Sequence, residues 1–499
     1  MDPGAARYYE QRVPSRAWDP RLFVPARLRP WFRWLLAWRR MSPPTLFLLS
    51  FVALIAIGTL GLMALPGLQV GPRLGFVDAL FTMTSAVCVT GLIVVDTATH
   101  FTGLGQAWLL LFIQLGGIGL ITLTTLLIGA LGHRLSLRSE ALALVPTRRE
   151  DRLKVWELAL RVTRFSLIVE GLGALALFGI WVFRFPPGEA LWHAVFHSIS
   201  AYCNAGFSTF SDSLVGFAGS PLTIIVISIL VILGGLGYLA LSELARWWRT
   251  ARRHGSGVRV RLRRRHRLSS HTWAVVVTTS LLLLGGWVLF AVFEWTNTLG
   301  AMSVLDRLTN ALFMSVTPRT AGFNTIDYTA VGNDSAALTM MLMFVGGSPG
   351  STAGGIKTTT LAVLVAIGMS RMRGHRFVGL KDRAIPQGTI ERTMGIILLA
   401  VLVLAVSFFA LSAIQAVGHT AAESRREFLP IAFETVSAFS TVGLSMNETG
   451  ALRAPSELVV IGLMFIGRVG LIAFFTAIVL RRSHPSAYLR PALEDVLVG

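Results

Sequence analysis

Charged residues are scarce in this chain, and so are cysteines. Only 14% of its 499 residues are Asp, Glu, Lys or Arg, whereas 53% are hydrophobic. A soluble chain could not bury that much apolar surface, so the composition excludes a soluble protein and predicts a polytopic membrane protein. The two cysteines, Cys88 and Cys203, each lie three residues before a glycine of the repeat described below. We expect both to be small, packed residues rather than a disulfide or a metal site.

Signals of targeting and of catalysis are also missing. The first 44 residues are rich in Arg and Pro and contain no apolar stretch of the signal-peptide kind. We expect them to form a cytoplasmic arm, with an interfacial helix near Trp31–Trp38. No nucleophile is paired with a base, and no span carries His and Glu at metal-ligand spacing. We therefore expect no enzyme activity and no organic cofactor on this chain.

Basic residues are confined to a few segments, and this decides what the net charge of +19 means. Of the 45 Lys and Arg residues, 34 lie in 1–44, 132–154, 246–267, 371–392 and 481–499. None lies in 92–105, 208–220, 295–305 or 324–335. This positive-inside pattern predicts a multi-pass membrane protein with both termini and three long loops in the cytoplasm. It also argues against nucleic acid as a partner.

One short pattern occurs four times. Each copy follows an apolar run and ends in a glycine and an apolar residue; the glycines, spaced 115, 116 and 121 residues apart, are Gly91, Gly206, Gly322 and Gly443. The fourth copy reads Thr-Val-Gly-Leu, the form of a potassium filter, in which backbone carbonyls replace the hydration shell of the ion. Glycine is needed because one residue must adopt a conformation that a Cβ forbids. The predicted ion-binding residues are Val89, Thr90, Gly91, Asn204, Ala205, Gly206, Thr320, Ala321, Gly322, Thr441, Val442 and Gly443.

The apolar runs around these copies define the predicted fold. Runs long enough to cross ~30 Å of hydrocarbon lie before and after each copy. They are 45–63 and 107–131, 155–183 and 222–244, 272–293 and 336–369, 393–416 and 458–480. The loops between them, 76–92, 189–207, 306–323 and 428–444, are too short to span and need the protein or water surroundings of a pore. We expect an all-α polytopic membrane protein with four helix–pore loop–helix repeats around a central pore.

The domain organisation follows from these runs. The predicted divisions are a basic cytoplasmic arm (1–44), repeat 1 (45–131), a cytoplasmic loop (132–154), repeat 2 (155–245), a basic cytoplasmic loop (246–271), repeat 3 (272–370), a cytoplasmic loop (371–392), repeat 4 (393–482) and a cytoplasmic tail (483–499).

The second spanning run of repeat 3 is interrupted. Residues 346–358 contain five glycines and a proline, which cannot form a stable helix interior. The segment is not a phosphate-binding loop, because Lys357 does not follow a glycine and no soluble strand precedes it. We interpret it as a gate within the membrane, with a static broken helix as the alternative. The predicted gate residues are Gly350, Ser351, Thr352, Gly354, Gly355, Lys357 and Arg468.

Charged residues inside apolar runs need partners. Arg468 lies near the middle of its predicted span, where carbonyls freed by the interruption could accept its hydrogen bonds. The alternative to a gate role is a structural one, in which Arg468 pairs with Glu434, for instance, or with the C-terminus of a helix. Arg468 and Lys357 would repel a cation on the cytoplasmic side of the filter. We expect Glu170 at a helix interface or subunit contact, and Arg319 turned away from the ion path toward pore-helix carbonyls or a carboxylate.

Other polar and small residues in these runs have structural explanations. Asp78 and Asp306 begin the short helices before the glycines, where the helix dipole favours acids. His193 and His197 are expected to be packed polar residues rather than metal ligands. Glycine clusters at 116–119, 234–237, 346–350 and 467–470 allow close helix packing.

The four glycine loops, the interrupted segment and the Gly-Arg-Val-Gly helix at 467–470 together resemble the Ktr/Trk/HKT superfamily of potassium transporters, over about residues 45–482. No additional pair of spans precedes repeat 1, so the chain is more similar to the Ktr membrane subunit than to the Trk type. The resemblance implies uptake of potassium (K+) across the cell inner membrane, often dependent on sodium (Na+). It also implies a homodimer with one pore per subunit, above a cytoplasmic ring of nucleotide-binding regulatory subunits. Plant relatives that favour sodium often carry serine at the first glycine, so Gly91 favours potassium.

Two alternatives stay open. The chain could be an alternating-access secondary transporter of K+ or Na+, although such folds usually contain inverted or two-fold repeats, whereas these four share one orientation. The basic loop 246–267 is expected to face membrane lipid, and docking of an acidic regulatory partner is its alternative role.

Overall fold

The computed structural model of the protein describes residues 43–130, 149–253, 268–375, 377–381 and 383–471. Regular structure within them is helical, as predicted, apart from an antiparallel hairpin of β1 (Gly379–Leu380) and β2 (Arg383–Ala384). The predicted basic arm, most of the loops 132–154 and 246–271, and the C-terminal tail lie outside the described residues.

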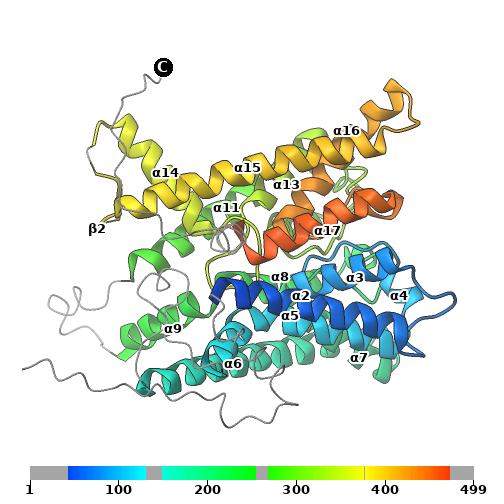
Figure 1. Ribbon diagram of the computed structural model, residues 1–499, viewed down its shortest axis with the longest axis horizontal. Coiled ribbons are helices and arrows are strands. Elements are labelled where there is room, and N and C mark those ends of the chain that lie inside the picture. Colours follow the sequence, from blue (N-terminus) through cyan, green and yellow to red (C-terminus); the bar gives the residue numbers. More distant parts are fainter. Residues whose placement is uncertain (1–42, 131–148, 254–267, 376, 382, 472–499) are drawn as a thin grey trace, which may run out of the picture.

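Each predicted repeat contains three principal helices (Figure 1). They are α2 (Pro43–Ala64), α3 (Phe76–Cys88) and α5 (Gly103–Ala130) in repeat 1, α6 (Arg149–Trp181), α7 (Pro187–Cys203) and α8 (Pro221–Leu236) in repeat 2, α11 (Ser270–Glu294), α12 (Val304–Val316) and α13 (Asn333–Phe344) in repeat 3, and α15 (Gln387–Gln415), α16 (Ala421–Ser440) and α17 (Ala454–Val469) in repeat 4. The middle helices α3, α7, α12 and α16, here called pore helices, each lead into a glycine loop. The other helical elements are α4 (Thr97–His100), α9 (Tyr238–Arg253), α14 (Thr358–Met372), η4 (Val215–Phe217) and η5 (Thr449–Ala451).

The pore helices begin with acidic residues. Asp78, Glu189, Asp306 and Glu423 lie in the four first turns, where a negative charge complements the helix dipole. At α12 the cap is Ser303, whose side chain accepts a hydrogen bond from the Asp306 backbone N–H and donates one to Asp306 Oδ2 at 2.6 Å. Side-chain caps therefore fix the starts of α12 and α16, whereas α3 and α7 begin without one.

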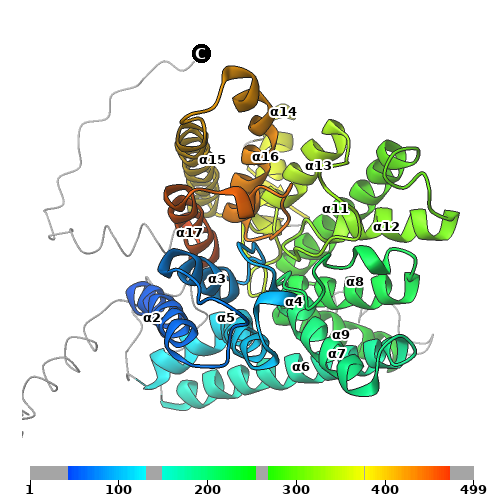
Figure 2. The same ribbon diagram turned by 90° about the vertical axis from the view of Figure 1, so that its right-hand side faces the viewer.

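The four repeats are arranged in a closed ring. The third helix of each repeat packs against the pore helix of the next: α5 contacts α7, α8 contacts α12, and α13 contacts α16. α17 of repeat 4 contacts α3 of repeat 1 and closes the series. In the view down the long axis of the molecule, the repeats are arranged in chain order around a centre (Figure 2).

Close packing between helices uses the predicted glycine clusters. A Cβ atom on Gly116, Gly234 or Gly467 would collide with a carbonyl oxygen near the end of the pore helix of the same repeat. Those oxygens belong to Val87, Tyr202 and Phe439. The expectation that these glycines allow close helix approach is therefore confirmed.

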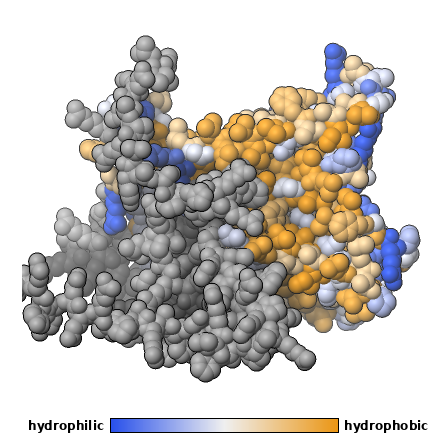
Figure 3. Space-filling model, in the orientation of Figure 1, coloured by the Kyte–Doolittle hydropathy of each residue, from blue (hydrophilic) through white to orange (hydrophobic). Residues whose placement is uncertain are grey.

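The first helix of each repeat is apolar enough to cross a membrane. Within the described residues, the long apolar segments are Thr45–Ala64, Ala159–Trp181, Ser270–Glu294 and Gln387–Gln415, close to the predicted spans. Over the described part of the visible surface, apolar side chains form a broad band, with hydrophilic ones gathered toward its two ends (Figure 3). The chain is thus a helical membrane protein.

Two predicted spans differ from the structure. The run 222–244 is divided at Gly237, where α8 and α9 meet at 102°. Gly237 has φ +79° and ψ 146°, a conformation open essentially to glycine alone. The run 458–480 contains α17, which ends at Val469 because Gly470 adopts a similar conformation, φ +87° and ψ 138°. Arg468 therefore lies in the last turn of α17, not in the middle of a helix.

Candidate functional site

The four glycine loops share an unusual backbone. Each contains a non-glycine residue with positive φ, followed two residues later by a glycine with positive φ. The non-glycine residues, with φ from 50° to 74°, are Val89, Asn204, Thr320 and Thr441. β-Branched residues rarely adopt this conformation, and it persists only where the surroundings impose it, often at functional sites.

The four loops meet around one axis. A Cβ atom on Gly206 would lie 2.9 Å from the carbonyl oxygen of Ala321 and 2.9 Å from the Cα of Gly322. The other three glycines would collide in the same way with the next loop: Gly91 with the Ala205 carbonyl, Gly322 with Val442, and Gly443 with Thr90. The structure thus brings together the predicted segments 89–91, 204–206, 320–322 and 441–443 in a closed ring.

Hydroxyl groups at the ends of the pore helices support these loops from behind, and sequence reasoning missed them. Ser85 and Ser437 accept hydrogen bonds from the backbone N–H groups of Gly91 (3.0 Å) and Gly443 (3.1 Å). Ser200 donates to the carbonyl of Phe207 at 2.8 Å, and Thr317 donates to that of Phe323. The available signal was a Ser or Thr six residues before each glycine, or five in repeat 3.

Three of the positive-φ residues, Asn204, Thr320 and Thr441, have polar side chains. In the orientation that satisfies both amide atoms of Asn204, its oxygen accepts from Thr320 Oγ1 at 3.3 Å. Its nitrogen then donates to the carbonyls of Ala201 (3.0 Å) and Val231 (3.2 Å). Thr441 Oγ1 has no hydrogen-bond partner among the described residues and lies against Gly354 of the interrupted helix.

The interruption of the repeat 3 helix lies at 345–357, since α13 ends at Phe344 and α14 begins at Thr358. This segment, called the break from here on, is held by repeat 2. Its Ser348 and Thr352 N–H groups donate to the carbonyls of Gly235 (2.9 Å) and Gly234 (3.3 Å). Thr352 Oγ1 also donates to the Tyr202 carbonyl at 3.1 Å. Without these bonds, the backbone of the break would contain unsatisfied polar groups at membrane depth.

Two basic residues use the freed carbonyls. Lys357 Nζ donates within the break, to the carbonyls of Ala353 (2.7 Å) and Gly354 (3.2 Å). Arg468, which is 4% exposed, donates through Nη1 to the Thr352 carbonyl and through Nη2 to the Gly116 carbonyl at 2.7 Å. Arg468 therefore joins α17, the break and α5. No ion pair of Arg468 with Glu434 is present among the described residues; Glu434 accepts from Thr449 Oγ1 at 2.6 Å instead.

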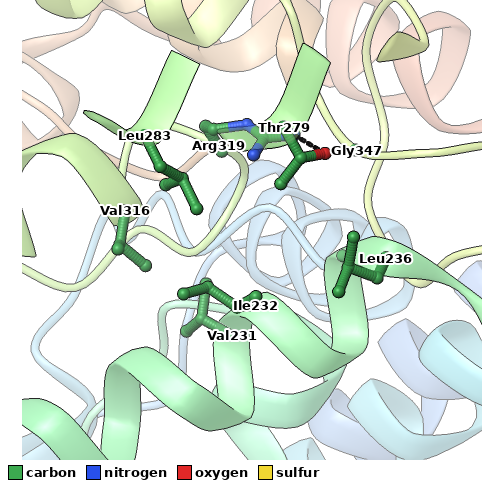
Figure 4. Close-up of a pocket in the computed structure, with 9 residues that line it drawn as sticks. Val231, Ile232, Leu236, Thr279, Leu283, Val316, Arg319 and Gly347 are labelled. Atoms are coloured by element: carbon green, nitrogen blue, oxygen red, sulfur yellow. Dashed lines mark hydrogen bonds between the residues drawn. The ribbon is translucent and has the colours of Figure 1, made fainter. Parts of the chain in front are cut away.

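Arg319 points away from the ring of glycines. Its Nη2 donates to Thr279 Oγ1 (3.4 Å) and to the Gly346 carbonyl (3.3 Å), rather than to the pore-helix carbonyls or carboxylate that we expected. The reason is that the break exposes a carbonyl next to it. Figure 4 shows Arg319 beside Thr279, at the edge of a small cavity with apolar walls. The other residues lining it are Val231, Ile232, Gly235, Leu236, Leu283, Val316 and Gly347.

The remaining polar residues lie apart from the glycine ring. Glu170 is at a helix interface, where Gln114 of α5 donates to it at 2.8 Å. His193 and His197 are packed, and they bond Thr209 Oγ1 (2.6 Å) and Ser208 Oγ (2.9 Å). Both cysteines are buried free thiols. In the described part of the chain, His, Cys, Asp and Glu form no group of three or more suited to a metal ion.

Four loops on one axis, carried by apolar helices, define a helical membrane transport protein with pore-loop repeats. The chain belongs to the TrkH family of cation transport proteins, whose sequence model matches residues 40–490. The resemblance to the Ktr/Trk group inferred from the sequence is thereby confirmed.

Known relatives match over nearly their whole length. The potassium/sodium uptake protein NtpJ of Enterococcus hirae is 33% identical over 463 residues, which are 92% of this chain and 98% of that protein. The Ktr system potassium uptake proteins B of Vibrio alginolyticus and Bacillus subtilis are 35% and 34% identical, over 91% and 88% of this chain and 95% and 93% of their own. The crystal structure of the potassium transporter TrkH from Vibrio parahaemolyticus has the same fold, with a TM-score of 0.65, 20% identity and coverage of 87% of this chain and 83% of that one.

Proposed function

We propose that this chain is the ion-translocating subunit of a Ktr-like potassium uptake system of the cell membrane. The observation that carries the proposal is the closed ring of four glycines, in which the glycine of each loop lies against a carbonyl oxygen of the next loop. Potassium passes along the axis of this ring, where backbone carbonyls replace its hydration shell. The relatives named potassium uptake proteins support this choice of ion.

The twelve predicted residues form the selectivity filter of this proposal. Positive φ at two residues of each loop turns successive peptide groups so that their carbonyls can face the axis. The hydroxyls of Ser85 and Ser437 accept hydrogen bonds from the N–H groups of Gly91 and Gly443 and so hold the first and fourth glycine loops in place. Potassium is the transported ion, and sodium stimulates its uptake in this proposal; the relative named a potassium/sodium uptake protein supports the involvement of both ions.

The break is the gate of this proposal. It is largely buried, it contacts Thr441 of the fourth filter segment, and it presents two glycines with positive φ, Gly350 and Gly355. Ser351 and Thr352 occupy its centre, and Lys357 and Arg468 bring two positive charges to its carbonyls. A cation leaving the filter would meet these charges, so the break must move before the ion passes.

The assembly follows the Ktr type. The subunit forms a homodimer with one pore per chain, with both termini in the cytoplasm and a ring of nucleotide-binding regulatory subunits at that side. Exposed apolar side chains along α15 suit contact with lipid or with a second copy. They include Leu398, Leu402, Val406 and Phe409.

The test uses the purified protein alone in liposomes. Potassium or rubidium uptake is measured with sodium as competitor, for the wild type, Gly443→Ser and a deletion within 350–355. The proposal expects potassium to move down its gradient, Gly443→Ser to lower the preference for potassium, and the deletion to raise the flux. Flux that requires a coupled ion gradient and ignores Gly443→Ser would favour alternating access instead.

A further inference from the structure

The four pore helices differ at one buried position, three residues before the hydroxyl that supports each glycine loop. The residues at this position are Thr82, His197, Met314 and Glu434, all at most 2% exposed. Met314 is apolar, and Thr82 Oγ1 has no hydrogen-bond partner among the described residues. His197 and Glu434 do have partners, and these lie in the chain beyond the glycine of the same loop. A fully buried His or Glu is uncommon, so their shared position calls for an explanation.

The chain that follows each glycine is called the post-glycine segment here. The four segments are 92–96, 207–214, 323–327 and 444–449. Each continues directly from the last of the three predicted filter residues of its loop. A group that holds a post-glycine segment in place therefore also limits the movement of the neighbouring carbonyls.

His197 holds the post-glycine segment of repeat 2. Its Nδ1 lies 2.8 Å from the His193 carbonyl oxygen, and its Nε2 lies 2.9 Å from Ser208 Oγ. Because a carbonyl can only accept, Nδ1 carries the proton of the neutral ring, and Nε2 is left to accept from the Ser208 hydroxyl. The ring also stacks on Phe210 of the same segment, with centroids 4.8 Å apart, and lies 6.0 Å from the ring of Phe323 in repeat 3.

The post-glycine segment of repeat 2 is bonded to the segments of both neighbouring repeats. Ser211 Oγ donates to Asp96 Oδ2 of repeat 1 at 2.5 Å. On the other side, the Leu214 N–H donates to the Asn324 carbonyl of repeat 3 at 3.0 Å. The Asn324 N–H in turn donates to Ser213 Oγ at 3.3 Å. The segments of repeats 1, 2 and 3 are thus joined, and the one in the middle is held by His197.

Glu434 holds the post-glycine segment of repeat 4. Its Oε1 accepts a hydrogen bond from Thr449 Oγ1 at 2.6 Å, and both side chains are buried. Within the segment, the Glu448 N–H donates to Ser445 Oγ at 3.2 Å and so closes a turn. His197 and Glu434 together therefore hold, directly or through a neighbour, the post-glycine segments of all four repeats.

We propose that His197 and Glu434 are positioning residues that set the preference of the glycine ring for potassium over sodium. A ring of carbonyls distinguishes these ions through the size of the site and the number of carbonyls around the ion. Both properties depend on loops that are held in place at each end, and the pore-helix hydroxyls support only the end nearer the helix. Neither residue touches the ion. The inference rests on the proposed function of the ring as the filter.

The test compares substitutions that remove the hydrogen bond with substitutions that keep it. His197→Leu removes the partner of Ser208, whereas His197→Gln supplies an amide that can replace it. Glu434→Leu and Glu434→Gln form the same pair toward Thr449. The matched control is Thr82→Val, at the equivalent position of repeat 1, which removes a hydroxyl without a partner among the described residues. Each full-length variant is reconstituted in liposomes, where sodium competes with rubidium uptake, and its amide hydrogen exchange is measured in detergent.

Both Leu variants should lower the preference for potassium roughly two- to tenfold, the effect expected of one lost hydrogen bond. Both Gln variants and Thr82→Val should stay close to the wild type. Exchange in His197→Leu should become faster at the N–H groups of Phe210 and, in repeat 3, of Asn324, because both bond the segment that His197 holds. A general loss of folded protein would instead lower the uptake of both ions and leave their ratio unchanged.

An unchanged preference in a Leu variant would overturn the proposal for that residue, as would an equal loss in its Gln variant or in Thr82→Val. If His197→Leu does not fold, Ser208→Ala removes the same bond from the other end and should give the same result. If the wild type itself conducts no potassium, the proposed function fails, and the exchange data then decide alone. Faster exchange at Asn324 in the repeat 2 variant supports the role of His197 in holding the segments, and unchanged exchange contradicts it.

Discussion

Thr441 and Gly354 are in direct contact. A Cβ atom on Gly354 would overlap Thr441 Oγ1 and lie 3.1 Å from its Cγ2. Thr441 begins the fourth filter segment, and Gly354 belongs to the break. The segment proposed as the gate thus meets the segment proposed as the filter at a point where one methyl group cannot be added.

Gly354→Ala should push the break away from the filter. Overpacking of this kind costs roughly 1–3 kcal/mol, so we expect a lower unfolding temperature and a higher potassium flux in liposomes. Thr441→Ala should restore the space, making the double variant more stable than the sum of the single effects predicts. Gly368→Ala on α14, where a Cβ would meet nothing within 4 Å, is the control. Equal effects of Gly354→Ala and Gly368→Ala would contradict the contact.

Gly443→Ser should lower the selectivity for potassium over sodium. Gly443 has φ +95°, and its added Cβ would collide with the Thr90 carbonyl of the first loop. The strain, on the order of 1–2 kcal/mol, would displace the Thr90 carbonyl, which the proposed function assigns to the filter. Competition of sodium with rubidium uptake measures the change. Gly450→Ser, in an open position of the same connection, should leave the competition unaltered. A selective Gly443→Ser channel would count against the ring as the filter.

Gly237→Ala should loosen the break from repeat 2. The conformation of Gly237 is closed to alanine, and the added Cβ would lie 2.9 Å from the Gly350 carbonyl. We expect a loss of roughly 1–3 kcal/mol of stability. Hydrogen exchange should also become faster at the N–H groups of Ser348 and Thr352, which bond the carbonyls of the preceding turn. Gly179→Ala on α6, with open space around it, should change neither quantity. Unchanged exchange at both amides in Gly237→Ala would refute this coupling.

Glu423 should make the start of α16 sensitive to acid. Its carboxylate accepts from the Thr420 N–H (2.7 Å) and hydroxyl (2.8 Å), and these bonds hold the pKa of Glu423 below its usual range. Because the folded pKa lies below the unfolded value of about 4.3, this stabilisation is complete above that pH and is lost as the pH falls through the folded pKa. Hydrogen exchange at 421–426, corrected for intrinsic rates, should show fraying from pH 5 to 3 in the wild type. Glu423→Gln should show much less change over this range, and an equal change would refute the prediction.

The sequence predicts those features of the fold that depend on local chemistry. Gly91, Gly206, Gly322 and Gly443 were identifiable because a positive φ and a close backbone approach leave no other residue type. The long apolar helices followed from composition alone. The interruption at 345–357 followed from its glycines and proline, to within one residue at each end.

Features that depend on tertiary partners were not predictable. The clusters 116–119 and 234–237 have nearly the same sequence, yet α5 continues to Ala130 whereas α8 ends at Leu236. The difference is that the break bonds the carbonyls of Gly234 and Gly235. Likewise, Ser85 accepts a hydrogen bond from the Gly91 N–H, whereas the equivalent Ser200 donates one to the Phe207 carbonyl.

Because the four repeats of the ring belong to one chain, each repeat can have its own sequence. Arg468 is an example. It occupies the place that Gly117 and Gly235 hold in repeats 1 and 2. In an assembly of four identical subunits, an arginine there would appear four times, and four guanidinium groups would crowd the axis with mutual repulsion. Fusion of the quadrants into one polypeptide allows a single copy, together with a single interrupted helix to receive it. A symmetric homotetramer must open all its quarters alike, whereas in this chain the proposed gate belongs to one quarter and the other three are left to support the proposed filter.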